Sequence, residues 1–227
     1  MIEFIWEYFR DERFLFPLIF TAKVTAVTTL LQLVLGVWLG RYLSQKSSPL
    51  RSAVDLAITL PLVFPPIALG FLLLLILGKG GPVGSFLSQY LGIRIIFTVW
   101  GVILASLIAG LPLIVKPVQS AIQETAFSLM EASYTLGKSE WQTFFHVVLP
   151  SIRKSIISGL SLAFGRSLGE VGLTLMLGGN IVGKTNTLSL EIYNAAFSGE
   201  FDRAIALSTV LGLISAVVFI SFKKSST

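Results

Sequence analysis

The chain has 227 residues, of which 54% are hydrophobic and only 13% are charged. Soluble domains usually carry about a quarter charged residues, and here the apolar residues fall in long blocks, so the composition indicates an integral membrane protein. No cysteine is present, which excludes disulfides and thiolate metal sites. The net charge of +5 is the excess expected when Lys and Arg gather at the cytoplasmic ends of membrane helices, so we predict no nucleic-acid partner.

Residues 1–16, MIEFIWEYFRDERFLF, alternate Phe, Ile and Trp with charged residues at roughly helical spacing. This pattern predicts a short amphipathic helix that lies in the membrane interface. A frayed polar leader is the alternative. The stretch lacks the basic start and the small-residue cleavage site of a secretory signal peptide, so none is expected.

Residues 17–222 are expected to form one all-α transmembrane domain, because a helix of about 20 apolar residues crosses a bilayer. The expected spans are 17–42, 53–77, 95–115, 156–177 and 204–222, followed by a short tail at 223–227. Lys and Arg are denser in the short loops on one side of these five spans than on the other. The richer side holds Arg41, Lys46, Arg51, Lys116, Lys138, Arg153, Lys154, Lys223 and Lys224. We therefore predict an N-terminus outside the cell and a cytoplasmic C-terminus.

The second span contains Pro61, Pro65 and Pro66. Proline removes a backbone donor and clashes with the preceding turn, so this helix should be kinked or unwound. In a membrane such a break persists only where it faces protein or a water-filled path. We therefore assign this span to a translocation path, with a simple structural kink as the alternative.

Arg166 and Glu170 lie four residues apart in the fourth span, so they share a helix face and can pair. Charges at mid-bilayer cost about 2.5–3.5 kcal/mol each on insertion scales, which favours a protein-lined or watery location. Two interpretations stand. Either Arg166 supplies positive potential for an anion along a path or gate, or the pair fixes the orientation of the helix.

Residues 178–185, GGNIVGKT, match the letters of a phosphate-binding P-loop. A true P-loop follows a strand and opens a helix, whereas here a membrane span precedes the motif, so we predict a glycine-rich turn. Its residues Asn180, Lys184 and Asn186 are expected to be exposed and to contact an extracytoplasmic partner. With a single histidine in the chain, neither a His-based metal cluster nor a catalytic site is expected.

Residues 117–155 are too long and too patterned for a structureless loop. Helical stretches are expected before Gly137, which suits a helix C-cap, and again after Ser139. Glu131-Ala132-Ser133 is followed three residues later by Gly137, and nine residues after that Val147 precedes Leu149-Pro150. This spacing resembles the cytoplasmic EAA loop of ABC import permeases, with Ser133 in place of the usual second alanine.

A second stretch, 166–193, is similar to the molybdate permeases of that class, with Val171 and Val182 standing where those proteins usually have Phe and Pro. The resemblance implies a type I ABC importer permease fold in a prokaryotic inner membrane. It also implies a homodimer that pairs with two cytoplasmic ATPase subunits, which bind ATP and Mg, and with an oxyanion-binding protein outside. The amphipathic helix from Ala126 to Leu136 would dock on the ATPase. A permease for sulfate or another solute, and a self-contained channel or secondary transporter, are the alternatives.

Overall fold

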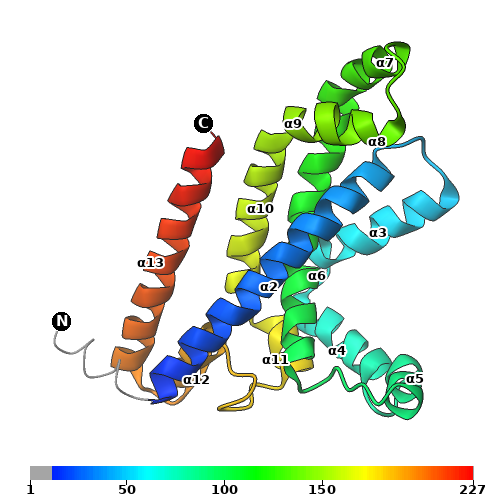
Figure 1. The fold of residues 1–227 in the computed structure, drawn as a ribbon. Coiled ribbons are helices and arrows are strands. Elements are labelled where there is room, and N and C mark those ends of the chain that lie inside the picture. The colour runs from blue at the N-terminus through cyan, green and yellow to red at the C-terminus, as the bar shows by residue number, and fades with distance from the viewer. Residues whose placement is uncertain (1–11, 227) are drawn as a thin grey trace.

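The computed structural model describes residues 12–226, in which every regular element is helical (Figure 1). The helices in chain order are α2 (Glu12–Leu43), α3 (Pro49–Val63), α4 (Pro66–Leu77), α5 (Pro82–Tyr90), α6 (Val99–Ala121), η1 (Ile122–Ala126), α7 (Phe127–Thr135), α8 (Glu140–Thr143), η2 (Phe144–Val148), α9 (Leu149–Ser151), α10 (Arg153–Leu168), α11 (Gly172–Gly178), α12 (Leu188–Phe197) and α13 (Phe201–Ser226). Most of the predicted interfacial helix, residues 1–11, lies outside the described residues; the rest of it belongs to the first turns of α2.

Three described helices are long and apolar enough to cross a bilayer, with candidate spans at Phe14–Leu43, Val99–Glu124 and Phe201–Phe222. Two bent pairs of helices meet the same criterion when each pair is counted as one span. One pair joins α4 to α5 with a bend of 45°, and the other joins Glu140–Ser151 to α10 with a bend of 69°. The described part of the chain thus has three to five candidate spans, which confirms the prediction of an all-α polytopic membrane protein.

Helix α6 lies at the centre of the bundle, with α2 and α10 packed against it. Close approach of α2 depends on two glycines one turn apart. A Cβ added at Gly36 would lie 2.4 Å from Ile114, and one at Gly40 would lie 2.5 Å from Val118. The GVWLG sequence therefore serves as a small-residue packing face, as membrane helices without a hydrophobic driving force between them require.

Two of the expected spans are divided in the structure. The span expected at 53–77 breaks at Phe64 and Pro65, between α3 and α4, which confirms the predicted effect of its prolines. The span expected as one helix at 156–177 is instead two helices, α10 and α11. Glycines on either side of Glu170, at 169 and 172, give this second break its local cause, since glycine weakens a helix interior.

The molecule has two ends, and α2 and α13 run from one to the other (Figure 1). Helices α7 and α8 and the end of α13 lie at one end, whereas α5, α12 and the start of α2 lie at the other. Helix α13 rests against α10 and α12 at the side of the bundle and leaves most of its apolar surface exposed. Such a surface suits lipid. The side of the membrane on which each end lies stays a prediction.

Candidate functional site

The loop with the importer spacing forms a helical hairpin between α7 and α8. Gly137 occupies the left-handed region at φ +76°, and its N–H donates to the Tyr134 carbonyl at 3.0 Å. The N–H of Lys138 donates to the Ser133 carbonyl at 3.2 Å. These two bonds satisfy the last carbonyls of α7 in the manner of a Schellman cap. The predicted helix end at Gly137 is confirmed.

The second arm of the hairpin begins at Ser139. The Ser139 hydroxyl accepts a hydrogen bond from the Gln142 N–H, and the Gln142 side chain accepts one from the Ser139 N–H. This reciprocal capping box satisfies two helix donors that would otherwise lack partners. The helical run continues through η2 and α9, where Leu149 and Pro150 lie just before the 69° bend into α10.

The motif residues of α7 divide between two faces. Glu131 and Ala132 are exposed, whereas Ser133 is buried against the second arm. The hydroxyls of Ser133 and Thr143 lie 2.9 Å apart and share a hydrogen bond. Because Ser133 is packed at the joint between the arms, the motif needs a small residue there, and here that residue also adds a polar link.

The outer face of the hairpin carries a hollow of about 470 Å³ with the apolar side chains of Leu129, Leu136 and Val147 in its lining. Leu136 is 79% exposed, and Trp141 and Phe145 are also exposed. Exposed apolar clusters of this kind mark sites of protein association. We call this face the coupling surface; the hollow in it is lined by Leu129, Ala132, Ser133, Leu136, Lys138, Gln142, His146 and Val147.

The two helix breaks lie side by side, although the residues of the break between α3 and α4 are largely exposed. A Cβ added at Gly172 would lie 3.0 Å from the Cβ of Pro66 and 3.2 Å from the Ile67 nitrogen. One turn further along α4, a Cβ at Gly70 would lie 2.8 Å from Met176. The beginnings of α4 and α11 therefore pack closely, so the structure brings the proline break next to the break that holds Glu170. Of the three predicted prolines, Pro66 is at this contact, Pro65 is exposed and Pro61 is half-buried within α3.

Arg166 and Glu170 form the predicted ion pair. Glu170 also accepts a hydrogen bond from the Leu173 N–H at 2.7 Å, so its buried carboxylate caps α11 while it holds the end of α10. The Arg166 side chain keeps 34% of its surface exposed. The geometry thus gives Glu170 a structural role and leaves Arg166 as a partly exposed cation at the break.

The loop between α11 and α12 closes on itself. Three successive N–H groups, those of Lys184, Thr185 and Asn186, point at the Ile181 carbonyl at 2.9–3.2 Å. In the described residues a helix, not a strand, precedes this loop. The turn predicted in place of a P-loop is confirmed.

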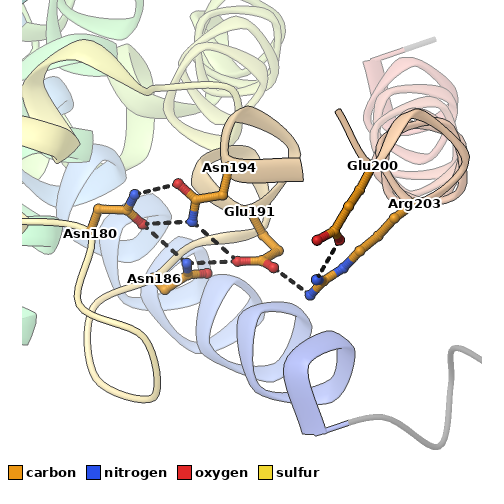
Figure 2. A network of polar contacts seen from close by, with 6 residues as sticks. All are labelled: Asn180, Asn186, Glu191, Asn194, Glu200 and Arg203. Atoms are coloured by element: carbon orange, nitrogen blue, oxygen red, sulfur yellow. Dashed lines mark hydrogen bonds and ion pairs between the residues drawn. The ribbon is translucent and has the colours of Figure 1, made fainter. Parts of the chain in front are cut away.

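A polar network ties the same loop to α12 and α13 (Figure 2). The Asn186 amide donates to Glu191 at 2.8 Å and to Asn180 at 3.1 Å, and Glu191 pairs with Arg203. Asn186 is only 1% exposed and Asn180 is half-buried, so the expectation that both are exposed is wrong. Lys184 is exposed as expected. Burial follows from the contacts with Glu191 and Arg203, which sequence reasoning missed.

A family model described as a binding-protein-dependent transport system inner membrane component matches residues 32–223. The chain belongs to this family. The matched range contains the hairpin, both helix breaks and the polar network, so every candidate site lies in the part of the chain that the family model covers.

Several curated relatives are permeases. The probable transport system permease protein NifC of Clostridium pasteurianum is 41% identical over 165 residues, which are 73% of this chain and 57% of NifC. The molybdenum transport system permease protein ModB of Azotobacter vinelandii is 38% identical over 166 residues, 73% of each chain. A sulfate transport system permease protein, CysW of Synechocystis, is 32% identical over 160 residues, 70% of this chain and 58% of CysW. The matched stretch thus spans little more than half of NifC. The resemblance to the permeases of this group is confirmed.

The fold itself matches a solved importer. A crystal structure of a bacterial ABC transporter involved in the import of alginate superposes with a TM-score of 0.78 at 19% identity, covering 99% of this chain and 82% of that one. A structure of a bacterial alginate ABC transporter in complex with a pentasaccharide-bound periplasmic protein gives 0.75 at 20% identity, covering 96% and 80%. The predicted importer permease fold is confirmed.

One further feature of this family member was missed from the sequence. Gln32, in the middle of α2, is fully buried and donates to the Ser167 hydroxyl at 2.7 Å and to the Ser106 carbonyl at 3.2 Å. Ser167 donates to the same carbonyl at 2.8 Å. These bonds join α2, α6 and α10 beside Arg166. A lone glutamine in an apolar span was the available signal, because a buried amide needs partners.

Proposed function

We propose that this chain is the translocation subunit of an ATP-driven ABC importer for a tetrahedral oxyanion, with molybdate as the first candidate and tungstate as the second. The capped hairpin with its exposed apolar surface carries this proposal. A self-contained channel or secondary transporter has no need of such a docking element. The ModB relatives at 36–38% identity favour molybdate over sulfate, whose CysW relative is 32% identical.

The energy source in this proposal is a separate ATPase that docks on the coupling surface. The GGNIVGKT stretch, which alone has the letters of a nucleotide site, folds as a closed turn after a helix. The partner would therefore bind ATP and Mg. Glu131, Ala132 and the apolar rim would meet its cleft, as a short amphipathic helix enters a groove, while Gly137, Leu149 and Pro150 set the shape of the hairpin.

The anion path in this proposal runs past the two adjacent breaks. Arg166 would supply positive charge there, offset in part by its ion-pair partner Glu170, so the about 4 kcal/mol of a unit charge at about 4 Å in a site of effective dielectric about 20 is the upper limit of its contribution. The broken start of α4, at Pro65 and Pro66, lines the same region. Few spans are available to enclose a gated path, so a second copy of the chain would complete it.

A binding protein would deliver the anion at the opposite end from the hairpin. Lys184 projects from the closed loop there and is exposed, and the Asn180 and Asn186 amides hold that loop in shape from below. The alginate transporter solved with its periplasmic protein is a precedent for such a partner in this fold.

Reconstitution in liposomes tests the proposal. The chain with its cognate ATPase and binding protein should import molybdate only when ATP is present, and the chain alone should not. Molybdate movement by the chain alone would overturn the ABC assignment. Stimulation of ATP hydrolysis by a sulfate-loaded but not a molybdate-loaded binding protein would overturn the substrate and favour a sulfate permease.

A further inference from the structure

One side chain in the last turn of α2, that of Arg41, reaches the second arm of the hairpin. The Arg41 Nη2 donates to the Glu140 Oε1 at 2.9 Å. Its guanidinium carbon also lies 4.2 Å from the centre of the Phe144 ring and 5.2 Å from that of Trp141. Arg41 and Glu140 are 99 residues apart in sequence. A single arginine thus holds one acid and two aromatic rings of the hairpin.

The surroundings of Arg41 strengthen this contact. The Arg41 side chain is 19% exposed, although Glu140 is 66% exposed, so the guanidinium is the desolvated partner. A cation over an aromatic face gains more when water is excluded. The planar guanidinium can stack and pair at once, which a lysine ammonium cannot do. The contact therefore requires arginine rather than positive charge alone.

Helix α2 connects this contact to the helix break. Gln32 lies nine residues before Arg41 on the same helix, about 14 Å away at 1.5 Å per residue. Gln32 is bonded to Ser167, the neighbour of Arg166. Along the backbone, by contrast, the hairpin reaches α10 only through a 69° bend. Helix α2 is thus a further connection between the hairpin and the break, in addition to the continuous run of α6, η1 and α7.

We propose that Arg41 is a positioning residue that fastens the hairpin to α2. Displacement of the coupling surface would then move Gln32 and Ser167, and with them the break between α10 and α11 that follows Arg166. This role rests on the proposed function, because it needs an ATPase on the coupling surface. Arg41 lies outside the Glu131–Pro150 motif, and its contacts are with Glu140, Phe144 and Trp141 rather than with the break itself.

The test compares Arg41→Ala, Arg41→Lys, Glu140→Arg and the swapped pair Arg41→Glu with Glu140→Arg in the assembled, reconstituted complex. Lys46→Ala is the matched control, because Lys46 is an exposed cation in the loop just after α2. The readout is the number of oxyanions imported per ATP hydrolysed, alongside co-purification of the ATPase. The swapped pair keeps both charges within reach and guards against simple loss of folding.

We expect Arg41→Ala and Arg41→Lys to retain the ATPase and its hydrolysis, and to lower import per ATP about tenfold, the effect of losing one partly desolvated pair with its cation–π contact. Glu140→Arg should behave alike, the swapped pair should recover part of the ratio, and Lys46→Ala should match the wild type. A wild-type ratio in Arg41→Ala or in Arg41→Lys would overturn the role of Arg41. A wild-type complex without ATP-driven import would instead overturn the proposed function.

Discussion

Replacement of Gly137 tests the left-handed backbone conformation of the hairpin turn without introducing a steric clash. Gly137 has φ +76°, and a Cβ added there would meet no atom within 4 Å. Gly137→Ala therefore introduces no clash, and its cost is the left-handed backbone alone, about 1–2 kcal/mol for a residue with a Cβ. Asparagine tolerates this region better, so Gly137→Asn should cost less. The cap bonds from the N–H groups of Gly137 and Lys138 would therefore weaken more in Gly137→Ala than in Gly137→Asn.

The assay is co-purification of the ATPase with the permease, measured over a range of ATPase concentrations. A cost of about 1–2 kcal/mol lowers the ratio of capped to uncapped hairpin about 5- to 30-fold, and the apparent affinity falls in proportion to the capped fraction that remains. Gly212→Ala is the control, since a Cβ there also meets nothing within 4 Å but the residue lies in helical α13. Equal affinities for Gly137→Ala, Gly137→Asn and the wild type would refute the view that the cap shapes the docking surface.

Three further substitutions test neighbouring contacts. Gly110→Ala would place a methyl group 2.2 Å from the Gln32 amide nitrogen and 2.6 Å from the Ser167 hydroxyl. We therefore expect the free energy of unfolding to fall by about 1–3 kcal/mol, seen as a lower melting temperature of the purified permease. Gly165→Ala, which has open space around it, should melt at the wild-type temperature. Ser133→Ala should cost about 1 kcal/mol through the lost bond to Thr143 and leave ATPase binding detectable, but Ser133→Leu should abolish it; equal binding by both would contradict the packed joint. Asn186→Ala should cost about 1–3 kcal/mol in the buried network and lower hydrolysis stimulated by the binding protein while basal hydrolysis persists, a split that a purely global unfolding would not produce.

Features whose cause is local in sequence were predictable. The hairpin cap needs only a glycine that can adopt positive φ and a Ser139 that can bond three residues ahead, so spacing within 20 residues defines it. Proline acts on its own preceding turn, which is why the break after α3 was predicted. The Arg166–Glu170 pair was accessible for the same reason, since residues four apart share a helix face.

Features that depend on which helices pack together were not predictable. Gln32 finds Ser106 and Ser167 at separations of 74 and 135 residues, and nothing in the sequence around Gln32 specifies those partners. Asn186 has the sequence setting of an exposed loop residue, but its side chain is buried where it bonds to Glu191, which in turn pairs with Arg203. The break between α10 and α11 had a local signal in Gly169 and Gly172, but glycines are frequent in membrane helices and do not by themselves indicate a break.

The division of labour between Glu170 and Arg166 follows from the same distinction. Alone, the spacing allowed either a structural pair or an anion site. The structure gives Glu170 two bonds, one to Arg166 at the end of α10 and one to the Leu173 N–H of α11, and leaves Arg166 with a third of its side chain exposed. Because Glu170 is itself the ion-pair partner of Arg166, the charge of Arg166 is neutralised while that pair holds. In the proposed transport cycle, a movement that separates α10 from α11 would force Glu170 to leave either the Leu173 N–H or Arg166, and loss of the Arg166 contact would present its positive charge to the transported anion.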